Sequence, residues 1–486
     1  MMKFNTVFLS SWLLAALPLL GGCAVGPDFK TPEAPTVASY GENGMPKATA
    51  GAKTSLGGVQ RFLAGGDVPA AWWTLFESAP LNDLITQAVK ANPSLEAARA
   101  SLRVAQETAT ASYGGFFPSL DGSASDNRKK TSAAGPYTLY NVGVSVSYTP
   151  DIFGVTRRTT EAADAAATAQ RFELEAAYLT LTDNVVTTAV LEASLREQIK
   201  ATQEIIAAQK KQLELTKAQL DAGAIAAPAY LAQAATVSAS ETALPPLEKQ
   251  LAASRNLMAV LLGRFPSEGV GATFTLASFK LPSDLPLTLP SKLVEQRPDI
   301  RTARANLEAA NAEIGIAMGA MLPQFPLTAS YGVSAGEIAS LFTPGTALWG
   351  LGAGLLQPLF KGGELLHKKR AKEAAFDAAA AQYRATVLAA FQNVADSLKA
   401  LESDAASLKA QLAAEQASAQ SLALTETQFK AGAINYVALL AAQSSYQTAK
   451  IALIKAKASR LSDTAALFQA LGGGWWGRTA ENGEAQ

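Results

Sequence analysis

The chain has 486 residues, of which 49% are hydrophobic, and it carries 41 basic and 41 acidic residues. This even balance of charge argues against a nucleic-acid-binding protein. A single cysteine and a single histidine exclude an intramolecular disulfide and argue against a metal site built from protein ligands alone.

Residues 1–22 are predicted to be a secretory signal peptide, because Lys3 precedes an apolar run from Val7 to Leu20. The sequence Leu20-Gly21-Gly22-Cys23 resembles a bacterial lipobox. Cys23 would then become the mature N-terminus, bearing S-diacylglycerol and N-palmitoyl groups. Ala24 follows it, where an Asp would favour retention at the inner membrane, so the outer membrane is favoured. An ordinary signal peptide with an incidental cysteine is the alternative.

Residues 23–78 are rich in Gly, Pro, Ala and Thr, and they predict an extended, lipidated segment without a core of its own. Apolar residues at helical spacing from Leu81 to Ser112 then predict a helix. This helix opens the first repeat of the chain, residues 79–262.

Two strands are predicted next, at about 118–126 and about 139–149. The second strand alternates strictly between an apolar and a small or polar face, Tyr140, Val142, Val144, Val146 and Tyr148 against Asn141, Gly143, Ser145 and Ser147. Its length and its aromatic ends suit a transmembrane β-strand. Taken alone, however, the strands favour a soluble hairpin with one buried face.

Residues 155–222 form a run of 68 residues without Gly or Pro, which predicts one helix about 100 Å long. Ile199, Ile206, Leu213 and Leu220 recur every seventh residue, as in the seam of a coiled coil. A tight turn at Gly223 leads into a return helix over 228–262, and a linker spans 263–290.

Residues 291–472 repeat this order of elements. Strands are predicted at about 326–334 and about 346–356, a long helix over 364–431, and a return helix over 436–471, before a tail at 473–486. Asp221-Ala-Gly-Ala-Ile225 recurs as Lys430-Ala-Gly-Ala-Ile434. The alternating steps of four and three from Val387 to Leu412 again predict a left-handed supercoil.

The predicted fold is therefore a mixed α/β membrane protein with an internal two-fold repeat. Four strands cannot close a barrel, and an open sheet edge cannot lie in lipid. A membrane-spanning barrel must then be shared between chains. Three chains would supply twelve strands and two chains eight, and geometry alone leaves both open.

Four motifs and the two Ala-Gly-Ala-Ile turns carry a family resemblance: Cys23-Ala-Val-Gly-Pro-Asp-Phe29 with Pro32, Trp72-Trp73-Thr-Leu-Phe76, Leu293-Val-Glu-Gln-Arg-Pro-Asp-Ile-Arg301, and Gln357-Pro-Leu-Phe-Lys-Gly-Gly363. With them the chain resembles the TolC-type outer-membrane factors, in the lipoprotein branch typified by NodT and OprM. The resemblance implies a homotrimer whose twelve-stranded barrel crosses the outer membrane and whose coiled-coil helices form a periplasmic tunnel.

The resemblance also implies a function and partners. The chain would be the passive outer-membrane channel of a tripartite efflux system that exports drugs, toxic small molecules or metal ions and so confers multidrug resistance. A periplasmic adaptor and an inner-membrane pump, of the RND type, would complete it. A type I protein-secretion channel and a periplasmic coiled-coil scaffold without a pore are the alternatives. The lipobox and the Gly-Pro-Asp-Phe segment favour efflux.

The two turns are the first candidate sites: Gly223, Ala224 and Ile225, and Gly432, Ala433 and Ile434. Each Gly is predicted to be a left-handed helix cap, and the resemblance implies that the turns touch the adaptor and form a periplasmic gate. Related proteins often carry an acid at the position of Ala441. Val437 and Ala441 are therefore predicted to form an apolar constriction, the alternative being that both are seam residues.

His367 lies in the basic run Lys361 to Arg370. A solvated face near lipid head groups is favoured over a packing or ligand role, and a lone histidine does not make a zinc site. The sequence holds no nucleophile elbow and no phosphate-binding loop. Neither an enzyme nor a cofactor is therefore expected.

Overall fold

The computed structural model describes residues 24–42, 44, 46–130 and 135–481. The chain divides into two compact units. The first comprises residues up to Pro32, Ser101–Arg171 and Thr302–Arg384; the second comprises Glu33–Ala100, Phe172–Arg301 and Ala385–Gln486. Each unit therefore takes segments from both halves of the sequence repeat. Within the described residues, no helix combines the length and the apolar character needed to cross a membrane.

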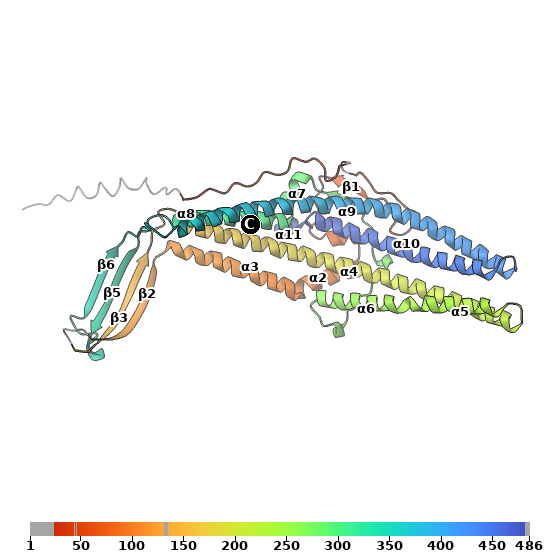
Figure 1. Cartoon of the computed structure of the whole chain (residues 1–486), viewed down its shortest axis with the longest axis horizontal. Helices are drawn as coiled ribbons and strands as arrows, with labels where there is room; N and C mark the ends of the chain where they lie inside the picture. The colour runs from red at the N-terminus through yellow and green to blue at the C-terminus, as the bar shows by residue number, and fades with distance from the viewer. Residues whose placement is uncertain (1–23, 43, 45, 131–134, 482–486) are drawn as a thin grey trace, which may run out of the picture. The chain divides into compact units, whose positions relative to one another are not determined.

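The first unit contains a four-stranded antiparallel sheet (Figure 1). Its strands are β2 (Ser119–Lys129), β3 (Tyr137–Tyr148), β5 (Leu327–Ala335) and β6 (Ala347–Ala353), in the order β2-β3-β5-β6. The four predicted strands are thus confirmed, although β2 runs further than expected. The central pair β3 and β5 comes from the two repeats, so each repeat contributes one central strand and one edge strand.

The register of this sheet separates its two faces. Val144 pairs with Tyr331, and Tyr331 pairs with Trp349. On the other face, Ser145 pairs with Ser330, and the hydroxyls of Ser119 and Ser147 lie 2.8 Å apart. Because side chains alternate across a pleated sheet, the alternation predicted for one strand extends over the sheet. One face is apolar, and Trp349 on it is 76% exposed.

Two long helices, α4 (Val155–Asp221) and α9 (Glu364–Lys430), each run for 67 residues. Neither contains a Gly or Pro, so nothing in the backbone interrupts them. The predicted seam of α9 is buried at six of its eight positions, Val387, Val394, Leu398, Leu401, Ala405 and Leu408. The side chain of Asp151 caps the N-terminus of α4: its carboxylate accepts hydrogen bonds from the amides of Thr156 and Arg157 at 2.9 Å.

The return segments differ between the two halves. After α9, α10 (Tyr436–Ala470) is one helix, as predicted. After α4, the predicted single helix at 228–262 is wrong. The structure has α5 (Ala227–Thr242) and α6 (Leu244–Leu261), which meet at Ala243. Pro245 and Pro246 explain the break, because neither can donate the amide hydrogen bond that would continue the helix.

The helix predicted from Leu81 to Ser112 is also divided, into α2 (Ala79–Ala91) and α3 (Pro93–Ser112). Asn92 caps the second of these through its side-chain oxygen, which accepts from the amide of Ser94 at 2.9 Å. The equivalent region of the second repeat holds α7 (Pro290–Gln296) and α8 (Pro298–Gly319). The tail at 473–486 contains α11 (Trp475–Glu481), which the sequence analysis did not predict.

Parts of the segment predicted to be extended pack against distant parts of the chain. β1 (Arg61–Ala64) pairs in parallel with β4 (Asp284–Leu287) of the linker. The side chain of Arg460, on α10, is fully buried and donates to the backbone oxygen of Leu56 at 3.0 Å and to Gln60 Oε1 at 2.9 Å. Trp72 is buried against Phe468 of α10, with ring centroids 5.6 Å apart. The part of the segment after Pro32 therefore contributes to the packed interior of the second unit.

Burial raises the pKa of two acids in the second unit. Burial and the neighbouring carboxyl group of Asp463 raise the pKa of Asp404 from 3.8 to about 7, against a smaller opposing effect of Arg460. Asp183 on α4, whose pKa burial raises to about 6, is a second such group. Both acids bind a proton more tightly in the folded chain than in the unfolded chain. Their contribution to stability is therefore complete at low pH and is lost as the pH rises through these values.

We expect the apparent melting temperature of the purified protein to fall between about pH 5 and about pH 8. Asp404→Asn should reduce this fall, because an amide does not titrate. Adding Asp183→Asn should further reduce the fall of the melting temperature with pH. Asp377→Asn, at an exposed acid of the same helix, is the control and should change nothing. An unaltered pH dependence in Asp404→Asn would show that this carboxyl group is ionised throughout.

Candidate functional site

The turns at Gly223 and Gly432 have the same backbone structure. Both glycines adopt positive φ, +73° and +72°, which an L-residue with a side chain rarely does. In the first turn, Gly223 N donates to Leu220 O at 2.9 Å and Ala224 N donates to Gln219 O at 2.8 Å. The second turn repeats both bonds one repeat later. These are Schellman caps, so the predicted structural role of both glycines is confirmed.

The two turns lie at the same end of the second unit (Figure 1). Ala224 and Ala433 are exposed there, whereas Ile225 and Ile434 are half-buried. Asn435 begins α10 by accepting a hydrogen bond from the amide of Ala438 at 3.0 Å. This end of the unit therefore presents two short, rigid loops with small exposed side chains.

Val437 and Ala441 are both exposed, and Val437 is 70% so. The seam of α10 runs instead through Tyr436, Leu439 and Ala442, which are buried. Val437 and Ala441 therefore lie outside the seam that α10 buries within its own chain. The two residues are four apart and share one outward helical face.

The hairpins near the turns bury polar side chains rather than a purely apolar seam. Gln233 of α5 donates through Nε2 to the backbone oxygen of Gln209 on α4 at 2.9 Å. Several buried oxygens have no hydrogen-bond partner in the described chain: those of Gln209, Gln219, Gln233, Tyr436 and Gln443. Each such oxygen costs about 1–3 kcal/mol when no water reaches it. The hairpins near the turns therefore bury more than an apolar seam.

Polar contacts also join the two hairpins to each other. Lys450 of α10 pairs with Glu204 of α4 at 3.0 Å, and the hydrogen bond from Lys450 lowers the pKa of Glu204. Ser240 of α5 lies 3.4 Å from Gln447 of α10. Both contacts are partly exposed, and exposed ion pairs contribute at most about 1 kcal/mol. They align the hairpins without fixing them strongly.

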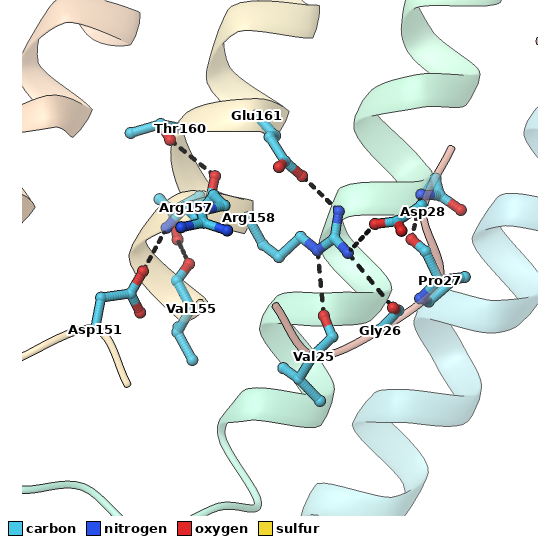
Figure 2. Close-up of polar contacts among 12 residues, drawn as sticks. Val25, Gly26, Pro27, Asp28, Asp151, Val155, Arg157, Arg158, Thr160 and Glu161 are labelled. Carbon is cyan, nitrogen blue, oxygen red and sulfur yellow. Dashed lines mark hydrogen bonds and ion pairs between the residues drawn. The ribbon is translucent and has the colours of Figure 1, made fainter. Parts of the chain in front are cut away.

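A second site, in the first unit, was not predicted. Arg158, whose side chain is 4% exposed, points into the segment that follows Cys23 (Figure 2). It donates to the backbone oxygens of Val25 at 3.2 Å and Gly26 at 3.4 Å and pairs with Asp28 and Glu161, each at 2.7 Å. The sequence offers two adjacent arginines, Arg157 and Arg158, and nothing in it distinguishes the buried one.

The remaining predicted site residues can also be placed. Cys23 lies outside the described residues. His367 is exposed near the start of α9, as a solvated face requires. Within the described chain, no group of three or more metal-ligating side chains is gathered in one place.

A sequence model of the family described as "Outer membrane efflux protein" matches residues 84–264 and 289–473. Outer membrane protein OprJ of Pseudomonas aeruginosa is 30% identical over 480 residues, which cover 96% of this chain and 95% of OprJ. The toluene efflux pump outer membrane protein TtgC of Pseudomonas putida is 28% identical over 472 residues, 95% of each chain.

Among solved structures, the Campylobacter jejuni CmeC outer membrane channel superposes with a TM-score of 0.84 at 22% identity, covering 95% of this chain and 97% of that one. This likeness shows the fold, which is the TolC type predicted from the sequence. The matched segments make up most of the chain and fall on both of its repeats. The chain therefore belongs to the outer membrane efflux protein family, whose members are outer-membrane channel components of efflux pumps.

Proposed function

We propose that the chain is the passive, trimeric outer-membrane conduit of a tripartite efflux system. The observation that carries the proposal is a four-stranded sheet with one exposed apolar face, in a chain that also forms two 67-residue helices. Membership of the efflux family supports it. Such a chain needs no catalytic group, because the energy for export is supplied elsewhere in the system.

The edges of the sheet support an assembly of several chains. Among the described residues, β2 and β6 each have one strand neighbour, and unpaired backbone groups in lipid cost several kcal/mol each. Pairing between chains removes both edges. Three chains give twelve strands, the number that the family resemblance implies, and we prefer this to the eight strands of a dimer.

The two faces of the sheet then have separate roles. The apolar face, with Val144, Tyr331 and Trp349 in one row, would contact lipid. The face with Ser145, Ser330 and Gly350 would line the aqueous channel, because lipid and lumen faces alternate in a barrel strand.

The turns at Gly223 and Gly432 would contact a periplasmic adaptor, which would link the channel to an inner-membrane pump of the RND type. Near the turns, Val437 and Ala441 would form an apolar ring across the three chains. Their exposure in the single chain supports this role, since a side chain that lines a pore must not be covered by its own hairpin.

The cargo is proposed from the relatives. One is named for toluene efflux, one for antibiotic efflux and one for pyoverdine export. We propose that this chain exports drugs, other toxic small molecules or metal ions, and that the pump selects among them.

We also propose that Cys23 is lipidated and holds the N-terminus at the outer membrane, with the helical hairpins in the periplasm. Acyl anchors contribute about 0.8 kcal/mol per buried CH₂.

An arginine at Val144 should reduce trimer yield in the outer membrane, whereas an arginine at Ser145 should not. An arginine on the lipid face near the midplane costs about 2–4 kcal/mol, but one on the lumen face stays in water. Heat-modifiable trimer is measured by gel electrophoresis of isolated outer membranes. Equal yields from the neighbouring variants would rule out a membrane strand.

Ala441→Asp should increase the cation preference of single channels and make their conductance sensitive to divalent cations. Three carboxylates in a narrow ring attract cations, whereas three alanines form an apolar ring that gates by dewetting. Ala441→Asn is the control, since it adds a similar volume without charge. Strong divalent block of the unmodified channel would instead assign the gate to another acid, such as Asp221 or Glu426. Absence of any conductance would indicate a coiled-coil scaffold.

A further inference from the structure

We propose that α5 of one copy packs against α9 of the next copy through two exposed stripes of side chains that match in register. The proposal rests on the homotrimer proposed above and names the helical surfaces that join its chains. α5 and the part of α9 after Arg384 belong to the second unit, where α4 and α10 lie between them (Figure 1). Gln233 of α5 donates to the backbone of α4, and Phe429 of α9 packs on Tyr436 of α10 with ring centroids 5.4 Å apart. α5 and α9 are therefore the two outer helices of this layer.

The repeat indicates what each outer helix should contact. The two hairpins have equivalent turns at Gly223 and Gly432, and within the chain Glu204 of α4 pairs with Lys450 of α10 at 3.0 Å. The same contact one hairpin further on would join Ala413 of α9, the equivalent of Glu204, to Glu241 of α5, the equivalent of Lys450. Because α9 and α5 are the outer helices of one chain, this contact requires a second copy of the chain.

The exposed side of α5 carries the first stripe. Its residues follow one another at steps of four, three and four, and all are exposed: Leu231, Ala235, Ser238 and Thr242. Three of the four equivalent residues on α10, an inner helix, are half-buried instead: Leu440, Gln447 and Ile451. The α5 stripe is therefore the surface that the repeat leaves uncovered at this edge of the described chain.

α9 carries a matching stripe on a face that points away from its buried seam. The residues again follow at steps of four, three and four, and all are exposed: Ala413, Ala417, Gln420 and Leu424. Leu231 and Leu424 each lie eight residues from the glycine of their turn, and Thr242 and Ala413 each lie nineteen. Since α5 leaves its turn and α9 approaches its turn, the stripes run antiparallel with every residue opposite a counterpart. Alternating steps of four and three are those of a coiled coil.

Charge also favours a second copy as the occupant. Leu231 and Leu424, which are 62% and 65% exposed, would cover each other. Further from the turns, Glu248 of α6 and Lys409 of α9 are exposed at nearly equal distances from their glycines, 25 and 23 residues. Opposite charges beside a coiled-coil interface set its partner and its register. Each copy offers one stripe of each kind, so a ring of three copies satisfies every stripe.

The test uses four pairs of cysteines in the full-length protein, treated with a short bismaleimide reagent in isolated outer membranes. The matched pairs, Leu231→Cys with Leu424→Cys and Thr242→Cys with Ala413→Cys, should give a covalent trimer on denaturing gels. The mismatched pairs, Leu231→Cys with Ala413→Cys and Thr242→Cys with Leu424→Cys, should not. Eleven residues of helix, about 16 Å, then separate the thiols. Each single variant controls for reaction at Cys23, the one cysteine in the sequence.

Charge reversal tests the same register without a reagent. Glu248→Lys and Lys409→Glu should each lower the temperature at which the trimer dissociates on gels, because each sets like charges side by side across the interface. The double variant should restore that temperature. Lys53→Glu, at an exposed residue of the N-terminal segment, is the control and should leave it unchanged. A double variant as labile as either single variant would overturn the register.

The outcomes separate this interface from the homotrimer itself. Absence of a trimer in the unmodified protein would overturn the homotrimer and the interface with it. A heat-modifiable trimer whose matched pairs give no covalent product would overturn the interface alone. Equal products from matched and mismatched pairs, or a product confined to one or two chains, would also overturn it.

Discussion

The constraint on which the fold depends is the unpaired backbone of β2 and β6. Their outer N–H and C=O groups belong to a sheet whose exposed face is apolar, and in lipid such groups must be paired. One chain does not pair them. Each half of the repeat supplies one edge strand and one central strand. Both edges of the sheet are therefore available for pairing with strands of neighbouring chains. In the proposed trimer, β2 of each chain would pair with β6 of the next, in a heterologous contact that closes by rotation.

The helical hairpins bury both apolar and polar side chains along their length. The seam of α9 from Val394 to Leu408 is apolar and buried, which stabilises it through the hydrophobic effect. Towards the turns, several buried glutamine oxygens have no hydrogen-bond partner in the described chain. Local rearrangement is least costly where buried apolar contacts are fewest. The proposed gate at the turns would draw on this tendency, and Schellman caps end both long helices there.

Much of this architecture could be predicted from the sequence because it depends on local signals. The absence of Gly and Pro defined the two long helices, strict alternation defined β3, and the glycine turns defined the hairpins. The break at Ala243 had a local signal too, in Pro245 and Pro246, which was outweighed by the helical composition around it. The apolar pattern also located α10 but not which of its faces was exposed.

The features that were missed depend on contacts between distant segments. β1 and β4 are four residues each and pair across more than two hundred positions, so neither has a pattern long enough to detect. Arg158 and Arg460 are buried only because segments far away in the sequence supply carbonyl acceptors. No spacing within α4 or α10 distinguishes them from the exposed arginines and lysines beside them.

The central claim is that three chains share one barrel, and the most direct test is the mass of the complex extracted from outer membranes in detergent. Native mass spectrometry should give three mature chains, each somewhat lighter than the 50.5 kDa precursor, with no stable smaller assembly. A complex of two chains, or a stable monomer in the membrane extract, would contradict the account.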